Sequence, residues 1–294
     1  ALPISQVRMM IGNADLVILL SPEKETNVAI NLSNPPGKQF VFSGQYATIN
    51  NEWCQPELIT KIPPVYSDGD LLDSIVGISA NEFKKRCINQ YKRYVTHNSA
   101  QLQFSEDTRT LANLSCAFDC LENLQATHYC LQTANQKKEN ITREQAFAAF
   151  LDVYLPDDFH NYLKDFPVNH PLALYCYNYR NVVMDLYDTH KDPLAYEKNL
   201  LKNAPLTKEE QTLIHQYETA FKAGISFQQE SELMALSAKY FKENDQFRWE
   251  SFSKAKERLS NIIQDSTSLI VDYIRAIYMR SSFYNLQPLT DRKS

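Results

Sequence analysis

Three cysteines and a histidine crowd into one short stretch of the chain, "CAFDCLENLQATHYC", at residues 116–130. Thiols in such a stretch can form disulfide bridges, bind a metal ion, act as nucleophiles, or lie buried as small apolar side chains. Which of these applies decides both the chemistry and the compartment that the sequence indicates. The full set of cysteines is Cys54, Cys87, Cys116, Cys120, Cys130 and Cys176.

The positions of these cysteines favour disulfides. Helices over residues 80–96 and 106–133, joined by a turn near residue 101, would place Cys87 opposite Cys116 at a separation that a disulfide can bridge. Cys120 lies one helical turn beyond Cys116 on the same face. An even number of cysteines also suits complete pairing. We therefore predict that all six cysteines form disulfides, with Cys87–Cys116 as the preferred pair.

The spacing Cys87-x28-Cys116-x3-Cys120 resembles that of the first three cysteines of insect odorant-binding proteins, which are small helical carriers of apolar ligands. The resemblance covers residues 87–120 and does not extend to Cys130 and Cys176. It implies only that such a spacing can support disulfides between helices.

A zinc site is the alternative interpretation, because Cys116, Cys120, His128 and Cys130 supply suitable donor atoms. Structural zinc sites favour tight Cys-x2-Cys turns, which are absent from this stretch. A continuous helix would hold Cys120 and Cys130 about 15 Å apart, too far to share one ion. We expect no metal and no other cofactor.

Two groups of acids and histidines could support metal-dependent hydrolysis. "MDLYDTHKD" brings together Asp185, Asp188 and His190, and "LPDDFHNY" contains His160. Carboxylate and imidazole groups of this kind can hold a divalent ion. A polar helix end explains the first group, and acids in the first turn of a helix explain the second, without any catalysis. We interpret these residues as weak catalytic candidates only.

Tyrosines are the third candidate group. In "LYCYNYR", Tyr175 and Tyr179 would share one face of a helix. Because tyrosine combines an apolar ring with a polar tip, such a face suits the binding of a protein or an apolar ligand. Core packing is the alternative explanation.

The elements that must position these residues divide along the chain. Residues 14–21, 27–33 and 38–49 are rich in β-branched and aromatic residues, which predicts strands of one small antiparallel sheet. Five of the six glycines lie in the first 77 residues, where strand-rich segments need them for turns. We predict a β-rich domain over residues 1–66.

Helix signals follow in series. Ser79, Ser105 and Thr207 are expected to cap helices, the first and last through capping boxes with an acid three residues later. An apolar stripe predicts one long helix from about residue 246 to residue 284. Residues 67–294 are therefore expected to form an α-helical domain. The predicted fold class is α+β, with a small N-terminal sheet followed by a disulfide-braced helical body and a long C-terminal helix.

Composition limits the classes of function. The chain has 294 residues, a net charge of −5 and 22% charged residues, which is typical of a globular protein and argues against nucleic acid as a partner. Its longest apolar run is far shorter than the ~20 residues of a transmembrane helix. The start "ALPIS" resembles a mature chain after removal of a signal peptide.

These observations predict a secreted or periplasmic binding protein without catalytic activity, which recognises a protein or an apolar ligand. The alternative is an exported metal-dependent hydrolase built on the scattered Asp and His residues. Whether the protein is an enzyme is left open.

Overall fold

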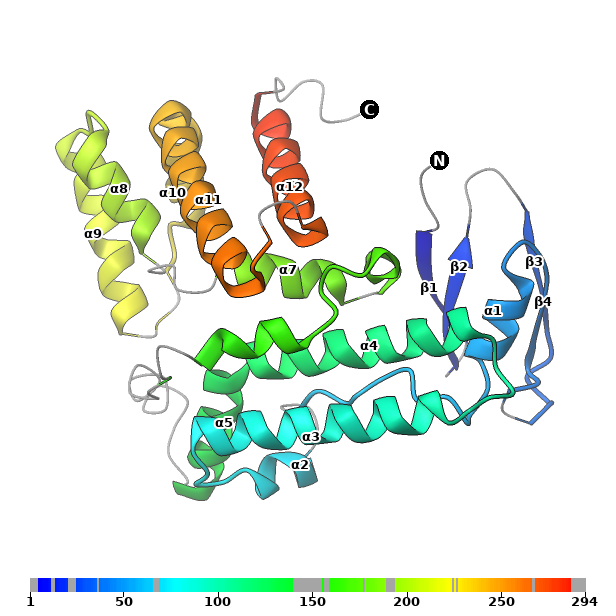
Figure 1. Cartoon of the computed structure of the whole chain (residues 1–294). Coiled ribbons are helices and arrows are strands. Elements are labelled where there is room, and N and C mark those ends of the chain that lie inside the picture. Colours follow the sequence, from blue (N-terminus) through cyan, green and yellow to red (C-terminus); the bar gives the residue numbers. More distant parts are fainter. Residues whose placement is uncertain are drawn as a thin grey trace. The chain divides into compact units, whose positions relative to one another are not determined.

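The computed structural model describes residues 5–11, 14–20, 25–35, 37–65, 69–139, 155, 159–176, 178–188, 194–223, 225, 227–265 and 268–286. The chain divides into two compact units, one formed by residues 1–131 with 165–182 and the other by residues 132–164 with 183–294. Figure 1 shows the elements of both. The expected division of the chain between residues 66 and 67 stays a prediction.

The first unit begins with two separate β-hairpins. Strand β1 (Ser5–Ile11) pairs with β2 (Ala14–Leu20), and β3 (Thr26–Ile30) pairs with β4 (Phe40–Gly44), both antiparallel. The prediction of a single sheet is therefore wrong: the described strands form two sheets of two strands each.

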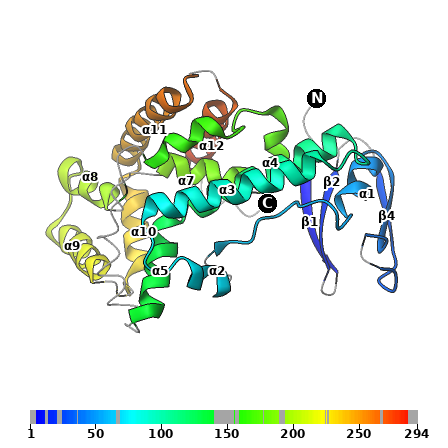
Figure 2. The same ribbon diagram turned by 60° about the horizontal axis from the view of Figure 1, so that its bottom comes forward.

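Helix α1 (Ala47–Trp53) explains why the hairpins do not merge, because it lies between β2 and β4 (Figures 1 and 2). Its consecutive residues Asn50 and Asn51 each bind one hairpin. The Asn50 amide accepts from Leu19 N at 2.9 Å and donates to Leu19 O at 3.1 Å. Asn51 does the same with Phe42, at 2.8 and 3.0 Å. Each amide thus binds the outward N–H and C=O of one strand residue, as a neighbouring strand would.

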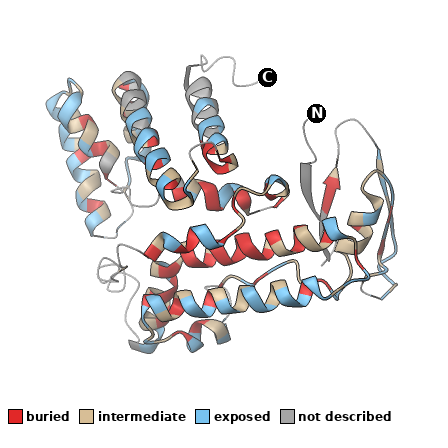
Figure 3. Ribbon diagram, viewed as in Figure 1, coloured by how far each residue is buried: buried red, intermediate tan, exposed pale blue. Residues whose placement is uncertain are grey.

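Helices α3 (Ala80–Ser99) and α4 (Glu106–Gln125) form the body of the first unit and pack side by side (Figure 1). The predicted N-caps are confirmed: Ser79 accepts from the backbone N–H of Glu82, and Ser105 accepts from that of Thr108. The capping box expected at Ser79 does not form, because the Glu82 carboxylate binds Arg86 instead. Helix α4 is buried along most of its length, whereas α3 exposes one side (Figure 3). Helix α4 is therefore the central element of this unit.

The connecting segment, residues 55–65, has no strand partner and is held by side chains of α3 and α4. The Asn98 amide pairs with both Ile59 N (2.9 Å) and Ile59 O (2.8 Å). Asp119 accepts from Ile62 N at 2.6 Å, and Asn123 accepts from Val65 N at 2.9 Å. Three buried polar side chains therefore satisfy an extended backbone that would otherwise be left without partners.

The N-terminus of α4 receives a further contact from α1. Glu52 accepts hydrogen bonds from the backbone N–H and the hydroxyl of Ser105 and from the hydroxyl of Thr108. A carboxylate at this position complements the partial positive charge of the helix end. The contact fixes α1, and with it both hairpins, to the helical body.

The described part of the second unit is built from helices. They include α8 (Ala195–Asn203), α9 (Lys208–Lys222), α10 (Glu230–Lys239), α11 (Phe241–Ile263) and α12 (Leu269–Leu286). The predicted capping box of Thr207 and Glu210 is confirmed at the start of α9. A core cluster of Leu200, Ile214, Leu236 and Tyr240 joins α8, α9 and α10.

Three elements contain the points at which the chain passes between the units. These are α5 (Thr127–Glu139), the 3-10 helix η3 (Phe159–Asp165) and α7 (Tyr179–Asp188).

The remaining elements of the first unit are α2 (Gly69–Ser74) and the 3-10 helix η4 (Pro171–Tyr175). All helices in the described residues are too short or too polar to cross a membrane.

The prediction of one long C-terminal helix is wrong, because the chain breaks between α11 and α12. Gln264 ends α11 in the left-handed conformation, with φ of 55° and ψ of 32°. Ser268 then accepts from Val271 N and starts α12. The apolar stripe continues across the break, so periodicity alone could not reveal it.

The disulfide prediction is also wrong, since all six cysteines are free thiols. The preferred pair fails through its register. Helix α3 ends at Ser99 and α4 begins at Glu106, so the turn between them is centred later than the expected residue 101. Cys87 accordingly interacts with Cys120 and Cys130. The described residues therefore form a mainly helical fold with two small hairpins, and no disulfide braces it.

The end of the second hairpin provides a test of this architecture. Gly44 has φ of +92°, and a Cβ there would lie 2.4 Å from the carbonyl oxygen of Glu25. Gly44→Ala should destabilise the protein by roughly 1–3 kcal/mol, measured by urea unfolding. Gly69→Ala is the control, because no atom lies within 4 Å of its new Cβ. It should be neutral or stabilise by roughly 0.5–1 kcal/mol. Equal effects of the two substitutions would contradict the hairpin geometry.

Candidate functional site

The cysteine-rich stretch forms a buried cluster on α4 and α5. Cys116, Cys120 and Cys130 are each at most 1% exposed, and His128 is half-buried. Burial raises the pKa of Cys116 to about 12, raises the pKa of Cys120 further, and lowers the pKa of His128. Within the described residues no group of three or more His, Cys, Asp and Glu side chains could hold a metal ion. The alternative zinc site thus has no support in the geometry.

The other three thiols have similar surroundings. Burial raises the pKa of Cys87 to about 12, that of Cys54 to about 11, and that of Cys176 above both. A thiol must ionise to act as a nucleophile or a metal ligand. These thiols therefore remain protonated near neutral pH and serve as apolar packing groups.

Asp119 is a buried acid within this cluster. One oxygen accepts from Ile62 N, and the other accepts from the Asn178 amide at 2.5 Å. The same amide nitrogen lies 2.9 Å from Glu122 Oε2. Burial raises the pKa of the Asp119 carboxyl to about 6, against the hydrogen bonds that favour its charged form. Because its oxygens are occupied by structural contacts, Asp119 holds the connecting segment and is poorly placed to act on a substrate.

The catalytic candidates are placed as follows. His160 is half-buried in η3, where its ring packs edge-on against Phe159 and its Nδ1 lies 3.5 Å from the hydroxyl of Tyr162. Asp185 is exposed on α7, and Asp188 is the last residue of that helix. His190 lies outside the described residues. The described geometry therefore does not assemble these residues into a reaction centre.

The two tyrosines lie in different surroundings. Tyr175 is half-buried at the end of η4. Tyr179 is 1% exposed, packs edge-on against Phe118 at 5.0 Å and donates to Val168 O at 3.4 Å. Tyr179 is thus part of the core of the first unit.

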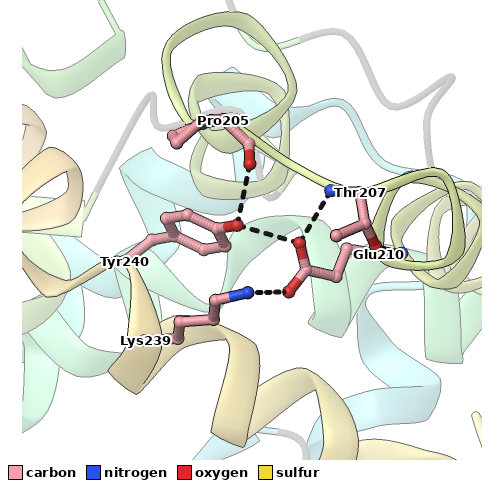
Figure 4. A network of polar contacts seen from close by, with 5 residues as sticks. All are labelled: Pro205, Thr207, Glu210, Lys239 and Tyr240. Carbon is pink, nitrogen blue, oxygen red and sulfur yellow. Dashed lines mark hydrogen bonds and ion pairs between the residues drawn. The ribbon is translucent and has the colours of Figure 1, made fainter.

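A polar network ties the start of α9 to the junction of α10 and α11 (Figure 4). Glu210 accepts from Lys239 Nζ at 2.6 Å and from Thr207 N at 2.8 Å. The hydroxyl of Tyr240 lies 2.8 Å from Glu210 and 3.0 Å from Pro205 O. The hydrogen bond from Lys239, above all, lowers the pKa of Glu210, so this carboxylate stays ionised and is unsuited to proton transfer.

A shallow hollow of about 450 Å³ lies beside this network. Its lining comes from α9 and the region of α10, and every lining residue except Leu213 is of a polar or charged type: Lys208, Glu209, Glu210, Thr212, Leu213, Gln216, Gln229 and Glu232. The network already occupies Glu210, and the hollow opens widely to solvent. It does not enclose a ligand.

The outer edge of β3 is the remaining candidate. Asn31 N donates to Gln39 O, and Gln45 N donates to Glu25 O. Antiparallel pairs alternate between bonded and non-bonded, so the N–H and C=O groups of Thr26, Val28 and Ile30 point away from β4. The described hydrogen bonds give the backbone groups of these three residues no partner along this edge. We define Thr26–Ile30 as the β3 edge.

The β3 edge and its partner strand carry no charged side chains and expose apolar ones. Ile30 is 43% exposed and Leu32 is 49% exposed. Residues 26–33 and 40–44 contain no Lys, Arg, Asp or Glu. Natural proteins usually protect free strand edges with charged residues, proline or covering elements. An unprotected edge is typical of a surface that pairs with another chain.

Sequence reasoning missed the asparagines that bind the hairpins and the connecting segment. Asn50, Asn51, Asn98 and Asn123 lie within helices, although asparagine is a poor residue for a helix interior. Asp119 and Asn123 also share one face of α4 with apolar neighbours. Polar residues on an apolar helix face were therefore the available signal.

Comparisons with family models, with curated proteins and with solved structures find no match to this chain in any of the three. Any function of this chain must therefore be inferred from the geometry of its described residues.

The pKa of Asp119 predicts a pH dependence of stability. Since its pKa in the folded state is about 6, above the ordinary value of 3.8, its contribution is complete below about pH 4 and is lost as pH rises through about 6. Asp119→Asn cannot ionise. Relative to wild type, its unfolding free energy should therefore rise by on the order of 2 kcal/mol between about pH 4 and pH 7.

Chemical denaturation across this range of pH measures the effect. Asp73→Asn, at an exposed position on α2, is the control and should keep the wild-type profile. A pH profile of Asp119→Asn parallel to that of wild type would contradict the burial of this carboxylate.

The state of the thiols gives a second prediction. In guanidinium chloride without reductant, an alkylating reagent should label all six cysteines. Labelling of the folded protein at mildly alkaline pH should be much slower, because burial keeps the thiols protonated. Intact mass spectrometry counts the labels. Fewer than six labels in the denatured protein would show that disulfides exist after all.

Proposed function

We propose that the protein is a non-catalytic binding protein that recognises extended polypeptide through the β3 edge. The observation that carries this proposal is the contrast between edges of the same unit. Side-chain amides bind the outward backbone groups of Leu19 on β2 and Phe42 on β4, whereas the described hydrogen bonds give the outward groups of Val28 and Ile30 on β3 no partner. Addition of a strand to such an edge is a common mode of peptide recognition.

The hairpin of β3 and β4 is held in place by a packed core and can therefore serve as a template for an added strand. Phe40 and Phe42 of β4 are buried in a core cluster with Ile18, against which Val28 also packs. The edge therefore rests on a packed core, which limits the entropy lost when a partner binds. Exposed Ile30 would provide an apolar contact for alternate side chains of the added strand.

The described chemistry supports binding over catalysis. The buried thiols are protonated, Glu210 is held by structural partners, and Asp119 binds backbone. Metal-dependent hydrolysis by Asp185, Asp188, His190 and His160 stays a prediction for which the geometry gives no added support. Location outside the cytosol likewise stays a prediction, and the free thiols remove the disulfide argument for it.

Selection from a random peptide library displayed on phage tests the proposal. Peptides should be enriched on the wild-type protein and should lose at least about tenfold in affinity for Val28→Pro. Proline removes the outward N–H of Val28 but leaves the bonds between β3 and β4 intact. Circular dichroism and thermal unfolding would verify that the variant folds. Peptides that bind Val28→Pro as tightly as wild type, or a selection that enriches none, would refute the proposal.

A further inference from the structure

We infer that the β3 edge pairs with the β3 edge of a second copy of this chain, giving a four-stranded antiparallel sheet across a two-fold axis at Val28. This inference rests on the proposed use of the edge for strand addition and names the partner. Its basis is the symmetry of the edge about Val28.

The bonding groups of the edge are self-complementary. Thr26, Val28 and Ile30 each direct N–H and C=O outward, and Val28 is the middle residue. In an antiparallel arrangement centred on Val28, this residue would face its own copy, and Thr26 would face Ile30 of the second copy. Since opposite residues at bonded positions exchange two hydrogen bonds, the pairing would form roughly six backbone hydrogen bonds.

Side chains agree with this register. Val28 would lie beside Val28 of the second copy, on the face that covers the hairpin core. Ile30, which is 43% exposed, would be covered by Thr26 of the second copy. No like charges would meet, because residues 26–33 carry none. A two-fold interface of this kind uses the same patch on both chains and closes after two copies.

The expected assembly is a weak dimer. A short edge pairing buries less surface than a standard interface, and such contacts are typical of reversible association. The dimer would occupy the edge that peptides use, so peptide binding and dimerisation should compete. This competition links the inference to the proposed function without making the two identical.

Sedimentation velocity over a range of concentrations of the full chain tests the inference. Wild type should show a reversible monomer–dimer equilibrium. Val28→Pro and Ile30→Lys should each raise the dissociation constant at least about tenfold. The first loses the two backbone hydrogen bonds that Val28 exchanges with its own copy, and the second replaces the apolar contact of Ile30 with Thr26 of the second copy by a charge at the edge. Val41→Lys is the matched control. It replaces a side chain that is 57% exposed on β4, one strand away from the edge, and should leave the constant within about threefold of wild type.

The outcomes separate the two proposals. A wild-type protein that stays monomeric, while library peptides still require Val28, would overturn self-pairing and leave peptide recognition intact. A dimer that Val28→Pro does not weaken would place the interface elsewhere and also overturn the inference. Loss of the dimer in Val28→Pro and Ile30→Lys, together with its displacement by a selected peptide, would support both proposals.

Discussion

Pairing between buried side-chain amides and extended backbone is the interaction on which this structure depends. An extended segment buried without a strand partner leaves N–H and C=O groups unsatisfied, which costs free energy for each group. Here Asn98 and Asn123 bind the connecting segment, and Asn50 and Asn51 bind the hairpins. A primary amide suits this task because it offers a donor and an acceptor side by side, like a peptide group. The first unit therefore stays compact without a continuous sheet.

This solution also determines which surfaces remain open. Helix α1 occupies the space between the hairpins and closes the edges of β2 and β4 through consecutive asparagines. In a single merged sheet, the outward N–H and C=O groups of β2 and β4 would instead have bonded to the backbone of a neighbouring strand. Separate hairpins instead leave the far side of β3 with outward groups and an apolar surround. The binding surface that we propose is thus a consequence of how the core is held.

The interior around α4 disfavours the charged forms of its ionisable side chains. Burial disfavours charge on the thiols of Cys116 and Cys120 and on the carboxyl of Asp119. Ionised groups with partners, such as Glu210 and Lys239, lie nearer the surface of the second unit. Catalysis by acids, bases or thiolates needs groups that change charge while reaching a substrate. The described groups either cannot ionise readily or are already engaged by structural partners.

The sequence by itself determined the local elements. Ser79, Ser105 and Thr207 marked helix starts, because capping depends on residues within one turn. It also determined that thiols would gather on α4, since helical spacing places them on related faces. Tertiary structure alone decided that these thiols form no disulfides. Cys87 lies near Cys120 and Cys130, and the thiol of Cys116 donates to the carbonyl oxygen of Ile59. Tertiary structure likewise decided that Asn50 and Asn51 separate two hairpins and leave the β3 edge open, since backbone groups distant in sequence acquire partners only when the chain packs.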